Sequence, residues 1–278
     1  MVNKNSINSS FFYLLSLILL IGIFSLVLVF NRDLYERITY EDRFVEYLGF
    51  AFLLIAGLFL ISSGVFGYFK KVRKVGVNIL LLFIGFVFLI AAFEEISWGQ
   101  RVLGFDTPDK LLEINQQDEF NFHNIDKKFF DRVVDRSNIL FVFFVAIMIL
   151  LKRDFIWGIR LPDTYLTLAF AIIPFYHQYN QVVLDFYHLL YIPLILFFLR
   201  AVMLKKRKEL AASLLAIITS LLLIWLHTKY NYHFPDHNNS ANEVKETLFS
   251  ITCAYYAYVI WTESSKMLKG EEKSVKGV

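Results

Sequence analysis

Residues 75–95 read VGVNILLLFIGFVFLIAAFEE, an apolar run that closes on the adjacent carboxylates of Glu94 and Glu95. The apolar part, Val75 to Phe93, is long enough for a helix that crosses the hydrocarbon core of a bilayer. Two carboxylates at the edge of such a helix are costly, and ionisable residues in a membrane are candidate functional groups. The simple alternative is a helix end at which headgroup water wets both side chains. The run therefore predicts a transmembrane helix and a first candidate site.

The composition of the whole chain predicts an integral membrane protein. Hydrophobic residues make up 57% of the 278 residues, charged residues make up 19%, and the mean hydropathy is +0.52. Soluble domains are usually about 45–50% apolar and about 25% charged. The net charge of +3 is concentrated in short loops, which fits membrane topology and not nucleic-acid binding. The single cysteine, Cys253, excludes an internal disulfide and disfavours a thiolate metal site.

Apolar runs of about 20 residues predict an all-α polytopic fold with about eight transmembrane helices. The runs are 11–30, 45–68, 75–98, 138–151, 163–180, 183–203, 209–228 and 243–264. We expect residues 1–10 to form an N-terminal tail and residues 11–265 to form the transmembrane domain, with a long loop at about 102–137. Residues 266–278 form a basic tail. The first run is expected to be a retained helix, because no small-residue cleavage site follows it.

The loop charges predict the topology, because Lys and Arg gather in cytoplasmic loops. Basic residues crowd the second, fourth and sixth connections and the C-terminal tail, whereas the alternate connections are poor in bases or balance them with acids. The basic positions are Lys70, Lys71, Arg73, Lys74, Lys152, Arg153, Arg160, Arg200, Lys205, Lys206, Arg207, Lys208, Lys266, Lys269, Lys273 and Lys276. Both termini are therefore predicted to be cytoplasmic.

With that topology, the polar clusters fall on the non-cytoplasmic face of the membrane. Glu94 and Glu95 end the third predicted helix there. All six histidines lie at the same face; they are His123, His177, His188, His227, His233 and His237. A single site at one membrane face is the simplest explanation of this one-sided distribution.

Glu94, Trp98 and Arg101 are spaced i, i+4 and i+7, so a continuous helix would place them on one face. Arg101 would then pair with Glu94, while Glu95 would point about 100° away. The dipole at a helix C-terminus disfavours negative charge, which favours the neutral acid form of the glutamate that lacks the cation. A carboxyl poised in this way suits general acid–base catalysis. The alternative is a structural Glu–Arg clamp.

A second constellation contains histidines and an aspartate. Asp185 and His188 are three residues apart at the start of a predicted helix, and His177 returns to the same level from the preceding helix. Together with His237, they would offer three imidazoles and a carboxylate, which can bind Zn²⁺ and activate a water. Pro235 interrupts the helical spacing before His237. The alternative is that these interfacial histidines hydrogen-bond loop backbone.

Two motifs resemble the signature of a family of uncharacterised bacterial polytopic membrane proteins. They are Glu-Glu-Ile-Ser-Trp-Gly-Gln-Arg at 94–101 and Asn115-x-Gln117-x-Glu119-x-Asn121-x-His123-Asn124, preceded by Glu41-Asp42-x-x-Val45-Glu46. The resemblance implies a multi-pass protein of the bacterial inner (cytoplasmic) membrane, and it supplies no activity. More loosely, the glutamate pair and the later histidines resemble CAAX-type intramembrane proteases and ceramidase-like membrane hydrolases. The candidate substrate-binding residues in these motifs are Trp98, Gln100, Asn121 and His123.

Two functions from different classes fit these residues. The first is an intramembrane hydrolase or transferase that acts on a lipid or lipid-linked substrate. In it, Glu94 or Glu95 would be the acid–base, Arg101 would anchor a phosphate or carboxylate, and His188 would assist. The second is a transporter that binds a cation or protons with the same groups. Transporters usually place ionisable residues near the bilayer midplane, where the predicted helices are almost free of charge, and this favours the enzyme. A non-catalytic membrane scaffold is a third possibility.

Overall fold

The structure is a computed structural model that describes residues 4–39, 43–109, 121, 123–177, 186–230 and 240–275, without some of their side chains. Helices make up almost all of the described part, and one short hairpin is its only strand pair, so the predicted all-α class is confirmed. The number of membrane spans and the sidedness of the termini stay predictions.

Six helices in the described part are long and apolar enough to cross a membrane, as expected for a membrane-spanning protein. They are Asn8–Phe30 within α1 (Lys4–Phe30), α3 (Phe44–Phe69), α4 (Val75–Glu95), Arg132–Leu150 within α7 (Lys127–Leu150), Phe186–Met203 across η4 (Phe186–Leu190) and α9 (Tyr191–Met203), and α10 (Arg207–Tyr230). Each contains an 18-residue stretch with at most two Asp, Glu, Lys or Arg residues.

Three of the eight predicted spans differ from the expectation. The fifth is a short apolar helix, because α8 (Thr164–Ile172) passes at Pro174 into the 3₁₀ turn η3 (Ile173–Phe175). The eighth, α11 (Ser240–Val275), is long enough but interleaves its apolar residues with Thr, Ser and Tyr, and it is not among the six. The fourth is longer than predicted, since α7 begins at Lys127.

The chain divides into two compact units, each described by itself. The first comprises Met1–Glu46, Lys127–Arg153 and Pro162–Phe249, and the second comprises Tyr47–Asp126, Asp154–Leu161 and Ser250–Val278. Helix α2 (Arg32–Thr39) in the first unit and the hairpin of β1 (Phe155–Ile156) and β2 (Ile159–Arg160) in the second were not predicted.

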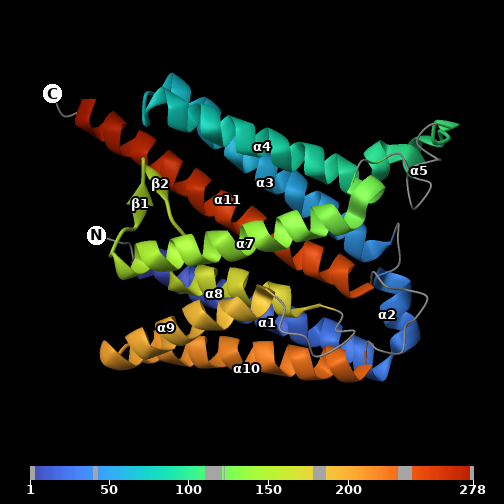
Figure 1. Cartoon of the computed structure of the whole chain (residues 1–278). Helices are drawn as coiled ribbons and strands as arrows, with labels where there is room; N and C mark the ends of the chain where they lie inside the picture. The colour runs from blue at the N-terminus through green and yellow to red at the C-terminus, as the bar shows by residue number, and fades with distance from the viewer. Residues whose placement is uncertain are drawn as a thin grey trace. The chain divides into compact units, whose positions relative to one another are not determined.

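Helix α8 forms the centre of the first unit. All nine of its residues are buried, and it contacts α1, α7, α9 and α10 (Figure 1). Phe170 packs edge-to-face against Phe141 of α7 and Phe249 of α11, with ring centroids 5.3 and 5.9 Å apart. Asn138 of α7 donates a hydrogen bond to the Phe170 carbonyl at 3.0 Å. Residues 164–175 would span about 18 Å as a helix, which is well short of a hydrocarbon core of about 30 Å.

The N-terminus of α8 is fixed by its own cap. The Asp163 carboxylate accepts a hydrogen bond from the Leu166 backbone N–H at 3.0 Å, and the Thr167 hydroxyl donates to the Asp163 carbonyl at 2.7 Å. These bonds satisfy polar groups that the first turn of a helix leaves open.

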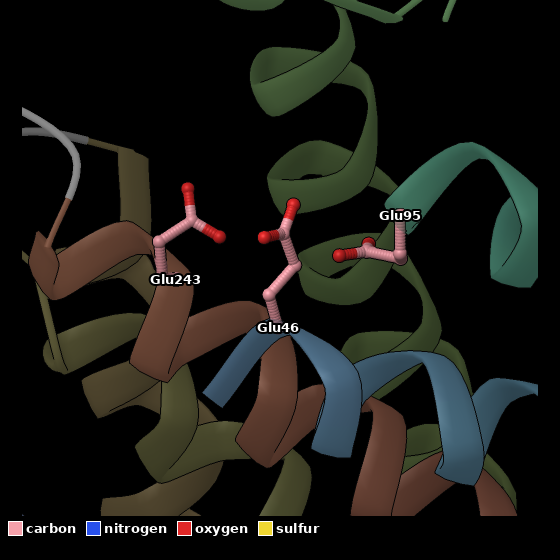
Figure 2. A group of neighbouring side chains, drawn as sticks. All are labelled: Glu46, Glu95 and Glu243. Carbon is pink, nitrogen blue, oxygen red and sulfur yellow. The ribbon is translucent and has the colours of Figure 1, made fainter. Parts of the chain in front are cut away.

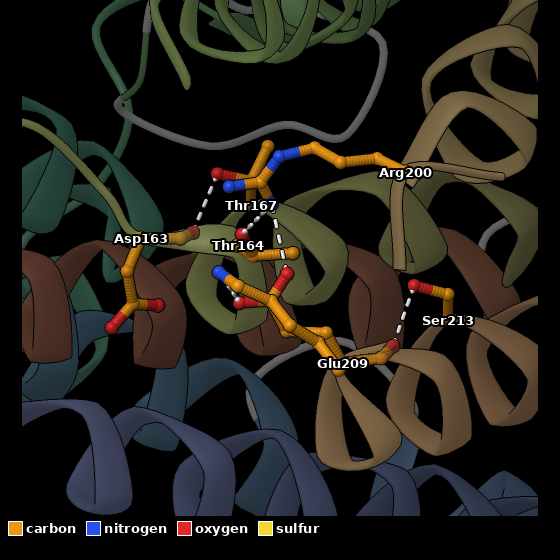
Figure 3. Close-up of polar contacts among 7 residues, drawn as sticks. Asp163, Thr164, Thr167, Arg200, Glu209 and Ser213 are labelled. Atoms are coloured by element: carbon orange, nitrogen blue, oxygen red, sulfur yellow. Dashed lines mark hydrogen bonds and ion pairs between the residues drawn. The ribbon is translucent and has the colours of Figure 1, made fainter. Parts of the chain in front are cut away.

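An ion-pair cluster stands beside that cap (Figure 3). Arg200 of α9 donates to Glu209 Oε2 of α10 at 2.8 Å and reaches the Thr164 hydroxyl at 3.5 Å. Lys206 pairs with the other Glu209 oxygen at 2.7 Å. Charged groups of this density belong at a membrane–water boundary. Helix α8 therefore starts beside a group of charged side chains, as expected at such a boundary.

In the second unit, α3 and α4 approach each other through glycines. A Cβ added at Gly57 would lie 2.7 Å from Leu89 Cδ2 and 2.9 Å from the Gly85 carbonyl oxygen. A Cβ at Gly85 would lie 2.7 Å from Ile61 Cγ1 and 3.0 Å from the Gly57 carbonyl oxygen. Small residues allow backbones of membrane helices to pack this closely.

We expect Gly85→Ala to destabilise the protein by about 1–3 kcal/mol, because the added methyl group overpacks this contact. Gly76→Ala on the same helix is the matched control, since a Cβ there meets nothing within 4 Å. The control should be neutral or stabilising by up to about 1 kcal/mol. Thermal unfolding in detergent measures both, and equal stabilities of the two variants would contradict the close packing.

Candidate functional site

The helix that carries the glutamate pair ends sooner than predicted. Helix α4 stops at Glu95, and Ser97, Trp98 and Gly99 adopt positive φ values of 47°, 56° and 78°. The 3₁₀ turn η1 (Ser97–Gly99) then leads into α5 (Gln100–Leu103). The predicted continuous helix from Glu94 to Arg101 is therefore wrong, because three left-handed residues redirect the chain.

The redirected chain still brings Trp98 to Glu94. The indole N–H of Trp98 donates to Glu94 Oε1 at 2.6 Å, and the ring stacks on Phe93 with centroids 5.7 Å apart and planes 15° apart. An indole that hydrogen-bonds a carboxylate at a helix end is typical of the membrane interface. The side chain of Arg101 lies outside the described residues, so its pairing with Glu94 stays a prediction.

Two of the candidate substrate-binding amides are buried in the segment that follows α4. Gln100 Nε2 donates to the Thr107 hydroxyl at 2.7 Å, and Asn121 Nδ2 donates to the Ser97 hydroxyl at 3.1 Å. These bonds hold the segment together. The side chain of His123 lies outside the described residues, and the substrate-binding roles stay predictions.

A carboxylate pair that was not predicted lies in the first unit. Glu46 and Glu243 occupy the first turns of α3 and α11, and their nearest oxygens lie within 4.8 Å of each other. Glu243 is only 6% exposed, and Glu46 is half-buried. The Thr247 hydroxyl of α11 donates to the Val45 carbonyl at 2.8 Å, which ties the two helix starts together. The positive ends of both helix dipoles stabilise the carboxylates.

Figure 2 shows the carboxylates of Glu46 and Glu243 facing each other from the first turns of α3 and α11. One carboxylate oxygen of Glu46 lies within 4.8 Å of one of Glu243. Of the two predicted acids, Glu94 is bonded to the indole of Trp98 within the second unit.

The C-terminal end of α8 carries a buried row of polar rings in the first unit. The hydroxyls of Tyr176 and Tyr35 lie 3.2 Å apart, and the Tyr176 ring packs edge-to-face on His227 at a centroid distance of 4.3 Å. All three side chains are fully buried. Buried polar rings of this kind hold one fixed arrangement when they bond to each other.

His177, the residue after Tyr176, connects these buried rings to the start of α11. His177 Nδ1 lies 3.2 Å from Asn242 Oδ1, which defines a hydrogen bond when Nδ1 carries the proton. Asn242 directly precedes Glu243 in the first turn of α11. The end of α8 and the carboxylate pair are therefore neighbours in the first unit.

Of the other predicted metal ligands, only His188 is described. It lies in η4, where its ring contacts Tyr187, Phe175 and Tyr191 at centroid distances of 4.6, 6.4 and 6.4 Å. Asp185 and His237 lie outside the described residues. The zinc set of His177, Asp185, His188 and His237 stays a prediction.

A buried ion pair follows Glu243 on α11. Lys245 Nζ lies 3.1 Å from Asp135 Oδ2 of α7, and the two side chains are 5% and 31% exposed. Because a buried ammonium needs a counter-charge, this pair fixes the first turns of α11 against α7.

Comparisons with known proteins add no relative. No protein-family model matches the chain, and no curated protein or solved structure matches it significantly. The family resemblance of the two motifs stays a prediction, and the candidate site is interpreted from its own geometry.

The donor chemistry of the described site is oxygen-rich. Carboxylate oxygens, with an amide oxygen one residue away, are the ligands preferred by hard cations such as Ca²⁺, Mg²⁺ and Mn²⁺. The sequence singled out Glu46 only as part of the motif ahead of the second predicted span. Glu46 and Glu243 both lie in the first turn of a helix. Their pairing across about 200 residues has no local signal.

We expect Asp135→Asn to destabilise the protein by about 3 kcal/mol, since it leaves the Lys245 charge buried without its carboxylate. The double variant Asp135→Leu/Lys245→Met should recover most of that loss, because it removes both charges. Thermal unfolding in detergent compares the three proteins. An Asp135→Asn variant as stable as wild type would show that the pair contributes nothing.

Proposed function

We propose that this integral membrane protein binds a divalent cation at the Glu46–Glu243 pair and belongs to the transporter class. The observation that carries the proposal is the Glu46–Glu243 pair, beside which the chain that follows the short helix α8 bonds through His177 to Asn242, the residue before Glu243. Transporters commonly build ion sites where a discontinuous helix ends inside the membrane. The negative end of a helix dipole favours a cation there.

The proposed ligands are the carboxylates of Glu46 and Glu243. Two carboxylates balance the charge of a divalent cation, and the N-termini of α3 and α11 stabilise both acids between binding events. Charge was expected near the centres of long helices if the protein were a transporter. The carboxylate pair lies instead in the first turns of α3 and α11, near the end of a helix that is too short to span.

The second candidate is the hydrolase or transferase that acts on a lipid or lipid-linked substrate. The Trp98–Glu94 hydrogen bond favours it, since an oriented carboxylate at the membrane interface suits general acid–base work on a headgroup. Glu95, Arg101 and His188 keep their proposed catalytic roles in that case. A location in the bacterial inner membrane is proposed on the motif resemblance alone.

Manganese binding tests the cation site directly. We expect purified protein in detergent to bind Mn²⁺, and Glu46→Gln and Glu243→Gln to weaken its affinity at least tenfold, since each removes a charged oxygen ligand of the same shape. Glu36→Gln is the matched control, because Glu36 lies in the exposed α2 pair with Arg32 at 3.9 Å. Equilibrium dialysis with metal analysis gives the affinities.

Two further results decide between the alternatives. If Glu46→Gln and Glu243→Gln leave the Mn²⁺ affinity unchanged and Asp185→Ala/His188→Ala lowers it, the metal binds at the predicted histidine set and not at the carboxylate pair. Mn²⁺ uptake into proteoliposomes that Glu243→Gln abolishes would support transport, whereas binding without uptake would contradict the transporter class.

A further inference from the structure

The hairpin between α7 and α8 presents a tryptophan in a strained position. Strands β1 and β2 are joined by Trp157 and Gly158, whose φ values are 51° and 81°. A two-residue turn with both φ values positive favours Asn or Gly, and a bulky residue there is strained. Trp157 is also 73% exposed, so packing within the protein does not account for it. Strain of this kind at an exposed aromatic residue indicates a function.

The second unit holds this turn at the level where two membrane helices end. Arg73 lies between the end of α3 at Phe69 and the start of α4 at Val75. Its Nε donates to the Gly158 carbonyl at 2.9 Å, and its Nη2 donates to the Ser264 hydroxyl at 2.7 Å. Because Arg73 belongs to the short connection between two candidate spans, the turn that it binds lies at a membrane boundary.

The base of the hairpin is fixed as well. Arg160 Nη1 pairs with Glu263 Oε1 at 2.7 Å, and the Tyr256 hydroxyl donates to the Arg160 carbonyl at 2.9 Å. Both partners lie on α11 in the same unit. The indole of Trp157 is therefore presented by a rigid support, which reduces the entropy lost on binding.

The surroundings of the turn combine aromatic and basic groups. Phe155 in β1 is exposed, and so are Lys70, Lys71 and Lys74 in the same connection as Arg73. Indoles favour the headgroup region of a bilayer, and each lysine near an anionic surface contributes about 1 kcal/mol of attraction. This chemistry complements a phosphate-bearing lipid with net negative charge.

We propose that the hairpin Phe155–Arg160 and the α3–α4 connection form a docking surface for anionic phospholipid headgroups. Trp157 inserts among the headgroups, and Lys70, Lys71 and Lys74 bind their phosphates. The surface is independent of the carboxylate pair and of any transport or catalytic role.

The test uses the full chain with Trp98→Phe, Trp225→Phe and Trp261→Phe, so that Trp157 is the one fluorophore of its kind. In nanodiscs, we expect brominated phosphatidylglycerol to quench its emission at least twofold more than brominated phosphatidylcholine at equal bromine content. Lys70→Gln/Lys71→Gln/Lys74→Gln should abolish this preference. Lys205→Gln/Arg207→Gln/Lys208→Gln, which removes three charges from the α9–α10 connection and the first turn of α10, should retain it.

A second measurement avoids the tryptophan replacements. In the otherwise wild-type chain, the Lys70/Lys71/Lys74 glutamine variant should retain fewer phosphatidylglycerol molecules through purification than the control variant. Equal quenching by the two brominated lipids would overturn the proposal. Quenching of Trp157 by aqueous iodide in place of brominated lipid would overturn it too.

Discussion

The fold of the first unit depends on one constraint, that a helix too short to cross the membrane must have both polar ends satisfied by protein. Hydrocarbon offers no hydrogen-bond partner, and each open backbone group there costs several kcal/mol. Helix α8 meets the constraint at its start with the Asp163 cap beside the Arg200–Glu209 pair. At its other end, Tyr176 and His177 find partners in Tyr35 and Asn242. The surrounding helices bury the apolar length between them.

The polar end of α8 also determines where the acids gather. His177 bonds to the first turn of α11, and Thr247 of α11 bonds to the start of α3, so two helix N-termini meet beside the end of α8. Two carboxylates whose oxygens lie within 4.8 Å of each other repel by at least about 1 kcal/mol in water and by at least about 3 kcal/mol at an effective dielectric of about 20. Helix dipoles offset part of that repulsion, and a bound cation would reverse it.

In the second unit, two arginine side chains are buried and need hydrogen-bond partners. Arg73 and Arg160 are both mostly buried, and both bond to the C-terminal half of α11, at Ser264 and Glu263. A guanidinium offers five donors in a fixed plane, so one side chain can hold both a helix and a turn. Arg73 uses that capacity to bind the Gly158 carbonyl, and this bond keeps the strained tryptophan turn in place.

Composition and run length by themselves predicted the helical membrane class, since a continuous apolar run of about 20 residues is the length at which a helix crosses a bilayer with its backbone hydrogen-bonded internally. Charge placement predicted a topology, and the Glu94–Glu95 pair marked one real helix end. Periodicity failed where long-range contacts decide. It predicted a full fifth span because apolar residues continue past Pro174, and a continuous helix to Arg101 because positive φ at Ser97 and Trp98 has no sequence signal. Only the tertiary structure brought Glu46 to Glu243 and His177 to Asn242, because such pairs depend on how distant helices pack.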